Sequence, residues 1–233
     1  MLKPVSSSRA GFVKSLYSRS IKYHREALSC ILEYRSAAHN QFPPRKSIWS
    51  KFYEEARGKY IHKKLSKHLL ERQKSLCCYC RDRIFHGKNS NIEHILPIKH
   101  YPMFAFDYNN LALACVTCNA LKSDNDFYRV KNLSGNYKAN LFDCLHPIFH
   151  TYDEHVDFLK LQTNHIYVRV FRFRSSLGER LCSEHLKQVS LFNIKEQANP
   201  TVAEAVKKLG EHLDGKPGYE SAASTLKRLA ANI

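Results

Sequence analysis

Four of the eight cysteines form two Cys-x-x-Cys pairs, Cys77 with Cys80 and Cys115 with Cys118. Two such pairs are typical of a closed zinc site, in which four thiolates surround the metal and each pair forms a tight knuckle turn. Because 34 residues separate the pairs, the sequence predicts a four-cysteine zinc site with a further segment inserted between its two halves.

The remaining four cysteines have no partner at this spacing: Cys30, Cys78, Cys144 and Cys182. Cys78 lies two residues before Cys80, which leaves too little chain for a normal knuckle, so Cys77 is the expected ligand. The N-terminal residues lack the apolar run of a secretory signal, and disulfides are rare in proteins of reducing compartments. We therefore expect these four side chains to pack as small apolar groups.

The inserted segment carries an ordered set of polar motifs. Asn91-Ile92-Glu93-His94-Ile95-Leu96-Pro97 comes first, Asn109-Asn110-Leu111 leads into the second cysteine pair, and Asn119-Ala120-Leu121-Lys122 follows that pair. Each motif alone is weak, but their order together with the cysteines is specific. Over residues 76–124 the sequence resembles the HNH endonuclease family, whose catalytic fold is a ββα-metal module.

His94 and its neighbours offer the chemistry that phosphodiester hydrolysis needs. The reaction requires an activated water, a Lewis acid for the leaving oxygen and a fixed in-line geometry. A neutral imidazole accepts a proton near physiological pH, so His94 is the candidate general base. The resemblance implies that Glu93 and Asn119 bind a catalytic Mg²⁺ or Mn²⁺, for which oxygen ligands are suitable.

The resemblance also implies supporting roles. Asn110 is expected to orient the loop that bears the catalytic histidine by hydrogen bonding, and structural zinc is expected to stabilise a module with little core of its own. Glu93 stands where the family often has aspartate, and its extra methylene moves the carboxylate outward. Lys122 lies one turn beyond Asn119, so it either contacts a phosphate or is an ordinary solvated helix lysine.

Helices are expected on both sides of this module. The spacing of apolar residues predicts helices over 20–37, 46–75 with a kink near Gly58, 178–193, 201–212 and 219–232, and a strand over 165–173. Residues 1–12 indicate a weakly ordered arm, and 41–44 a break. The predicted fold class is α+β and mostly helical, with a basic helical region at 1–75, the central zinc-stabilised module at 76–128 and a C-terminal α+β region at 129–233.

The net charge of +16 points to a polyanionic partner. Residues 1–75 hold 17 basic and 5 acidic side chains, so most of the excess lies before the module. We expect one face of the 46–75 helix to bind nucleic acid through Lys59, Lys63, Lys64 and Lys67. The alternative is that acidic patches elsewhere in the fold neutralise this charge.

The predicted function is a metal-dependent endonuclease that hydrolyses DNA with His94 as the general base. The resemblance implies products with a 5′-phosphate and a 3′-hydroxyl. Two alternatives remain at this point: a non-catalytic zinc module that binds nucleic acid or a protein, and a nuclease of the same kind that acts on RNA.

Residues 141–156 look similar to the segment that follows the motif in HNH subunits of Septu-type and retron-associated anti-phage systems (PtuB-like proteins). This resemblance implies bacterial anti-phage defence, a partner ATPase and a protein interface in the C-terminal helices. The histidines of the same stretch, His146, His150 and His155, have loose spacing and are expected to pack or lie at the surface. The longest apolar run, 111–116, is too short to span a membrane, and a cytoplasmic location is expected. The sequence leaves the oligomeric state open.

Overall fold

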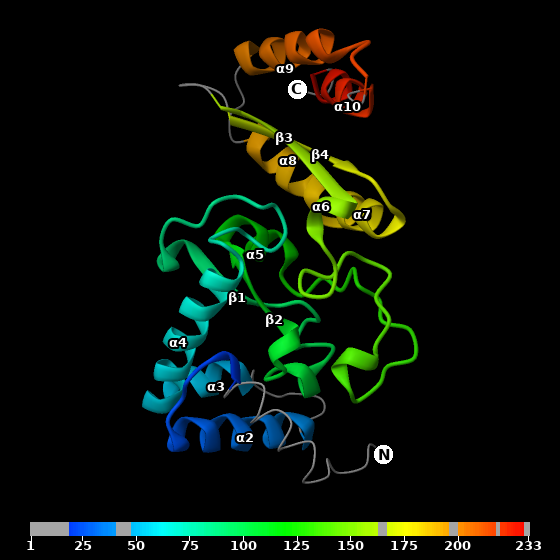
Figure 1. Ribbon diagram of the computed structural model, residues 1–233. Helices are drawn as coiled ribbons and strands as arrows, with labels where there is room; N and C mark the ends of the chain where they lie inside the picture. Colours follow the sequence, from blue (N-terminus) through cyan, green and yellow to red (C-terminus); the bar gives the residue numbers. More distant parts are fainter. Residues whose placement is uncertain (1–18, 41–47, 163–166, 196–199, 218–219, 231–233) are drawn as a thin grey trace. The chain divides into compact units, whose positions relative to one another are not determined.

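The computed structural model describes residues 19–40, 48–162, 167–195, 200–217 and 220–230, and the expected arm and the break at 41–44 lie outside them (Figure 1). The chain forms two compact units, residues 1–142 and 143–233. These units do not coincide with the three expected regions, because 1–75 and 76–128 share the first unit. The three-region division therefore stays a prediction about what each part does.

In the described part of the first unit, helices α2 (Arg25–Asn40), α3 (Ile48–Glu54) and α4 (Ala56–Arg72) precede the central module. On α4, Ile61 and Leu65 are buried at a spacing of four residues, which places them on one face of the helix. In Figure 1 these helices lie beside the hairpin of β1 (Ser90–His94) and β2 (Leu111–Cys115), and α4 contacts β2.

The predicted helix over 46–75 is divided in two. The break falls at Glu55, which has extended backbone angles and precedes α4. Gly58 lies in the first turn of α4, where an added Cβ would be only 1.7 Å from the carbonyl oxygen of Phe52. The end of α3 therefore approaches α4 so closely that only glycine fits at this position.

The central module consists of two antiparallel strands and one helix. Strand β1 (Ser90–His94) pairs with β2 (Leu111–Cys115) so that His94 lies opposite Leu111. Helix α5 (Val116–Lys122) follows β2 directly. Short 3₁₀ turns complete the unit at η1 (Gly87–Asn89), η2 (Pro102–Phe104), η3 (Tyr108–Asn110) and η4 (Tyr137–Ala139). The connection β1–β2–α5 is the predicted ββα arrangement.

The second unit is a hairpin with helices packed against it. Its strands are β3 (Val156–Gln162) and β4 (Tyr167–Phe173), and its helical elements are α6 (Tyr152–His155), α7 (Ser176–Leu181), the π-helical turn η5 (Cys182–Leu186), α8 (Lys187–Lys195), α9 (Pro200–Leu213) and α10 (Glu220–Ala230). Strand β4 and the last two helices match the prediction, whereas β3 was not predicted. Valines of β4 form a core with apolar residues of α9 and α10.

The fold is α+β and mostly helical, as predicted. Among the described residues, no helix combines the length and apolar character that crossing a membrane requires.

Candidate active site

The four predicted zinc ligands come together. The sulfur atoms of Cys77, Cys80, Cys115 and Cys118 all lie within 4.8 Å of one another, and three of these residues are buried. Within the described part of the chain, this is the one group of three or more Cys, His, Asp or Glu side chains that could hold an ion. Four thiolates around one point fit a closed, structural zinc site.

Main-chain donors around the sulfur atoms support this interpretation. The N–H of Cys115 donates to Sγ of Cys77 (3.3 Å), and the N–H of Cys118 donates to Sγ of Cys115 (3.4 Å). The second bond also caps the start of α5. The site therefore joins the first knuckle to both β2 and α5, the two elements that carry the rest of the module.

Three of the four other cysteines, Cys30, Cys78 and Cys144, are buried as expected. Cys182 is only half-buried, so the expectation that it packs as a core residue was too strong.

His94 ends β1 with its ring held by a main-chain group. Its Nε2 lies 2.9 Å from the carbonyl oxygen of Ala105. Because a carbonyl oxygen only accepts, Nε2 carries the hydrogen, and Nδ1 of the neutral ring keeps its lone pair. Burial lowers the pKa of His94 to about 4. The ring is therefore neutral at physiological pH, with Nδ1 as its basic atom.

The ring of His94 also packs against a helix outside the motif. The indole of Trp49 on α3 lies at 4.6 Å between ring centroids with an interplanar angle of 86°. This edge-to-face contact is a favoured geometry for aromatic pairs. No pattern in the sequence indicated it, because Trp49 lies 45 residues earlier and resembles any core aromatic.

Glu93 forms an ion pair with Lys122 in the interior. Nζ of Lys122 lies 2.6 Å from Oε1 of Glu93, and the two side chains are 1% and 5% exposed. The hydroxyl of Tyr79 donates to the same oxygen (3.2 Å). Burial raises the pKa of Glu93, and the lysine charge opposes that rise. The alternative of Lys122 as a solvated helix lysine is wrong, because its ammonium group is enclosed beside Glu93.

Asn110 is fully buried and fastens the segment that follows His94. Its Oδ1 accepts from the N–H of Leu96 (2.7 Å) and from the hydroxyl of Tyr137 (3.0 Å). Its Nδ2 donates to the carbonyl oxygens of Leu96 and Phe104, each at 3.1 Å. These bonds hold both ends of the 96–104 loop. The residue after this loop, Ala105, supplies the carbonyl oxygen that binds the ring of His94. Tyr137 was not anticipated, since it lies outside the motif.

A pocket of about 430 Å³ opens at the end of β1 beside α5. Four of the predicted residues line it: Glu93, His94, Asn119 and Lys122. Asn110 does not line the pocket and acts on it only through the loop. Lys99 and Asp124 also line the pocket, and neither was predicted.

The donors in the pocket fit a hard divalent cation. Glu93 offers a carboxylate and Asn119 a half-buried amide, which are oxygen donors of the kind that such ions prefer, and these ions commonly complete their shell with water and phosphate. Oε1 of Glu93 already accepts from Lys122, so a cation would share this carboxylate with an ammonium group.

Residues 77–125 match the family model for the HNH endonuclease. The match spans the four cysteines and every pocket residue predicted from the sequence. The HNH match and the four-cysteine cluster fit a zinc-binding HNH subtype and support a metal-dependent nuclease in general terms, with nucleic acid as its substrate. Searches of curated proteins and of solved structures returned no match.

The four lysines expected to bind nucleic acid lie outside the HNH segment, on the exposed face of α4: Lys59, Lys63, Lys64 and Lys67. None of them lines the pocket. Arg72, at the end of the same helix, instead donates to the carbonyl oxygen of Leu111 (2.9 Å) and covers the ring of Tyr108. Arg72 therefore attaches α4 to β2.

Proposed function

We propose that this protein is a metal-dependent endonuclease that hydrolyses phosphodiester bonds of DNA, with His94 as the general base. The observation that carries the proposal is the hydrogen bond from Nε2 of His94 to Ala105, which leaves Nδ1 as the basic atom of a neutral ring at a pocket. A general base must combine such a lone pair with access to the reacting water.

The residues of the pocket have different roles in the proposed reaction. Nδ1 of His94 removes a proton from the attacking water, while the loop fastened by Asn110 keeps the ring in place. Glu93 and Asn119 would hold Mg²⁺ or Mn²⁺, which supplies a Lewis acid for the leaving oxygen. The products carry a 5′-phosphate and a 3′-hydroxyl.

Two further parts of the chain support the reaction. Zinc held by the four cysteines keeps the knuckle, β2 and α5 in register. The exposed lysines of α4 hold DNA phosphates without sequence preference, so DNA binding weakens steeply as salt rises.

The physiological setting follows from the resemblance of residues 141–156 alone. On that basis we propose a cytoplasmic role in bacterial anti-phage defence with an ATPase partner that contacts the C-terminal helices. A partner of this kind would restrain a nuclease that is otherwise toxic to its own cell.

The test is a cleavage assay on plasmid DNA, single-stranded DNA and RNA with Mg²⁺, Mn²⁺ or EDTA. We expect DNA to be cut with either metal, no cutting in EDTA and no cutting by His94→Ala. His212→Ala changes an exposed histidine of α9 and serves as the matched control. Equal cutting by His94→Ala would contradict the mechanism.

Two other results would favour the alternatives. Cleavage of RNA alone would identify RNA as the substrate. Binding of nucleic acid without cleavage, under every metal condition, would favour a non-catalytic zinc module.

A further inference from the structure

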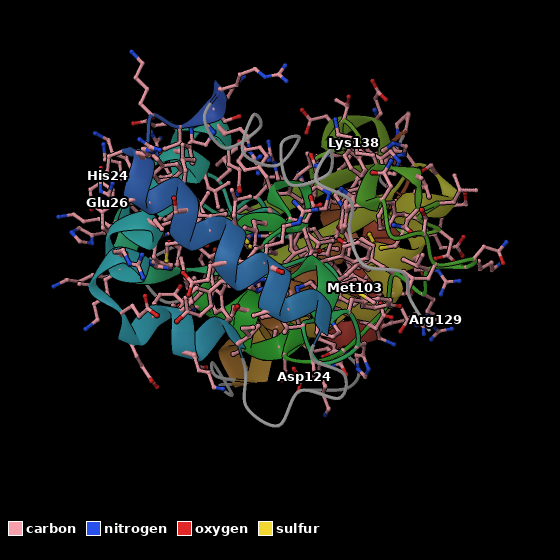
Figure 2. All side chains as sticks on the ribbon, turned by 90° about the horizontal axis from the view of Figure 1, so that it is seen from below. His24, Glu26, Met103, Asp124, Arg129 and Lys138 are labelled. Carbon is pink, nitrogen blue, oxygen red and sulfur yellow. The ribbon has the colours of Figure 1, made fainter. Side chains whose placement is uncertain are left out.

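Two ion pairs line the pocket, and they differ in their access to solvent. The inner pair joins Lys122 to Glu93, and both side chains are almost completely buried. The outer pair joins Nζ of Lys99 to Oδ2 of Asp124 at 3.5 Å, and these side chains are 66% and 61% exposed. Asp124, labelled in Figure 2, lies two residues beyond the end of α5.

The inner lysine is held by the protein itself. Its ammonium group donates to Glu93 and, at 2.9 Å, to the main-chain carbonyl oxygen of His94. Moving it to a substrate phosphate would leave Glu93 as a buried carboxylate without its cation, which is costly. Lys122 is therefore poorly suited to the phosphate contact that the sequence suggested.

The outer lysine has the opposite properties. An exposed ion pair at this distance contributes little free energy, so Lys99 exchanges one anionic partner for another easily. Its main chain is nevertheless fixed, because the N–H groups of His100 and Tyr101 both donate to the carbonyl oxygen of Pro97. Of the residues that line the pocket, all of them described, the two lysines are the cations.

We propose that Lys99 is the phosphate-binding residue of the pocket and that a DNA phosphate replaces Asp124 as its partner. This inference rests on the proposed function, since it assigns the substrate contact of that same pocket. Contacts to phosphates fix the position of DNA on a protein, so Lys99 positions the strand whose bond lies at His94.

The experiment measures binding of a fluorescent DNA duplex by anisotropy, with the zinc-loaded His94→Ala protein as the parent and without added Mg²⁺ or Mn²⁺. We expect Lys99→Met to weaken binding roughly 3- to 10-fold and to lower the slope of log affinity against log salt by about 0.9. Asp124→Asn is expected to tighten binding by up to about 5-fold.

The chain offers a matched control in the second unit. Lys208 and Glu204 on α9 form an exposed pair at 2.8 Å, with side chains 71% and 64% exposed. Lys208→Met and Glu204→Gln make the same changes of charge at residues that do not line the pocket. We expect both to leave affinity and salt slope within about 2-fold of the parent, because they lie outside the proposed contact.

The outcomes separate this inference from the proposed function. If Lys99→Met binds as the Lys208→Met control does, while the parent binds DNA, the role of Lys99 is wrong and the proposed function stands. If the parent binds no DNA even at low salt, both fail together.

A double variant tests the exchange itself. If Asp124→Asn tightens binding equally with and without Lys99→Met, Asp124 acts by repulsion alone and the exchange is wrong. If Asp124→Asn no longer tightens DNA binding in the Lys99→Met protein, the result supports the exchange.

Discussion

Lys122 of α5 donates to both residues of the Glu93-His94 dipeptide, to Oε1 of Glu93 at 2.6 Å and to the main-chain carbonyl oxygen of His94 at 2.9 Å. A single ammonium group thus joins the helix to the end of β1, where the candidate base lies. The contact places a positive charge in the interior next to the one carboxylate expected to bind the catalytic metal. The stability of the module and the chemistry of its pocket therefore depend on the same pair.

Replacement of this lysine should strongly destabilise the first unit. Lys122→Met leaves Glu93 buried without its cation, and removing one partner of a buried pair typically costs about 3–5 kcal/mol. Urea unfolding of the zinc-loaded protein measures the change. Lys99→Met makes the same substitution at an exposed pocket residue and should change stability by less than about 1 kcal/mol.

A second variant separates charge from packing. Adding Glu93→Gln to Lys122→Met removes the uncompensated carboxylate and should recover part of the stability. No recovery would mean that Lys122 acts through the packing of its side chain and its bond to His94.

The histidine predicts a pH dependence. Burial lowers the pKa of His94 to about 4 in the folded chain, against about 6.5 when unfolded. The unfolded chain therefore binds the extra proton first, and stability falls as pH decreases from about 6.5 towards 4. The contribution of this residue is about 3 kcal/mol at most.

Comparison with His94→Gln isolates that contribution. Burial also lowers the pKa of half-buried His62 to about 4, but His62 is present in both proteins, so its effect cancels. We expect the variant to lose less stability than the parent between pH 6.5 and 4.5. Nitrogen NMR of the zinc-loaded protein, without Mg²⁺ or Mn²⁺, should show a neutral His94 ring with hydrogen on Nε2 from pH 5 to 8. A signal from the charged ring near pH 6 would contradict the proposed state of the base.

The candidate site was predictable where spacing along the chain determines the chemistry. Two Cys-x-x-Cys pairs specify a four-sulfur cluster, since each knuckle is a local structure and one metal satisfies both. The roles expected of Glu93 and His94 came from the resemblance of the motif, not from spacing alone.

Contacts between distant segments were not predictable. Nothing near Lys122 in sequence indicates that it pairs with Glu93, because the partner lies 29 residues earlier and is brought close only by packing of α5. The contact between Trp49 and His94 was unpredictable for the same reason, because it also joins segments that are far apart in the sequence. Strand β3 was missed because apolar and polar residues do not alternate in its sequence, VDFLKLQ: Asp157 lies on the half-buried face with Leu159, whereas Phe158 is exposed.

Zinc content should follow the cysteine assignment. We expect about one zinc per chain, absent from Cys118→Ser, because a closed site needs all four thiolates. Cys78→Ser is the matched control, since Cys78 is buried beside a ligand but lies outside the four-sulfur group. Metal analysis of purified proteins checks both. Full zinc content in Cys118→Ser, or its loss in Cys78→Ser alone, would overturn the ligand set.

The lysines of α4 should control DNA affinity without touching the chemistry. Changing Lys59, Lys63, Lys64 and Lys67 together to Gln removes four exposed charges, all outside the pocket. Each DNA phosphate that the variant no longer binds should lower the salt slope by about 0.9. We expect weaker binding and a flatter salt dependence, but an unchanged cleavage rate at saturating DNA.

Four exposed lysines of the second unit provide the control for this variant: Lys207, Lys208, Lys216 and Lys227. Their replacement by Gln removes the same total charge. If both quadruple variants weaken binding equally, net charge alone attracts DNA and α4 is not a binding face. If only the α4 variant does so, the basic helix beside the HNH segment holds the substrate while the pocket supplies the reaction.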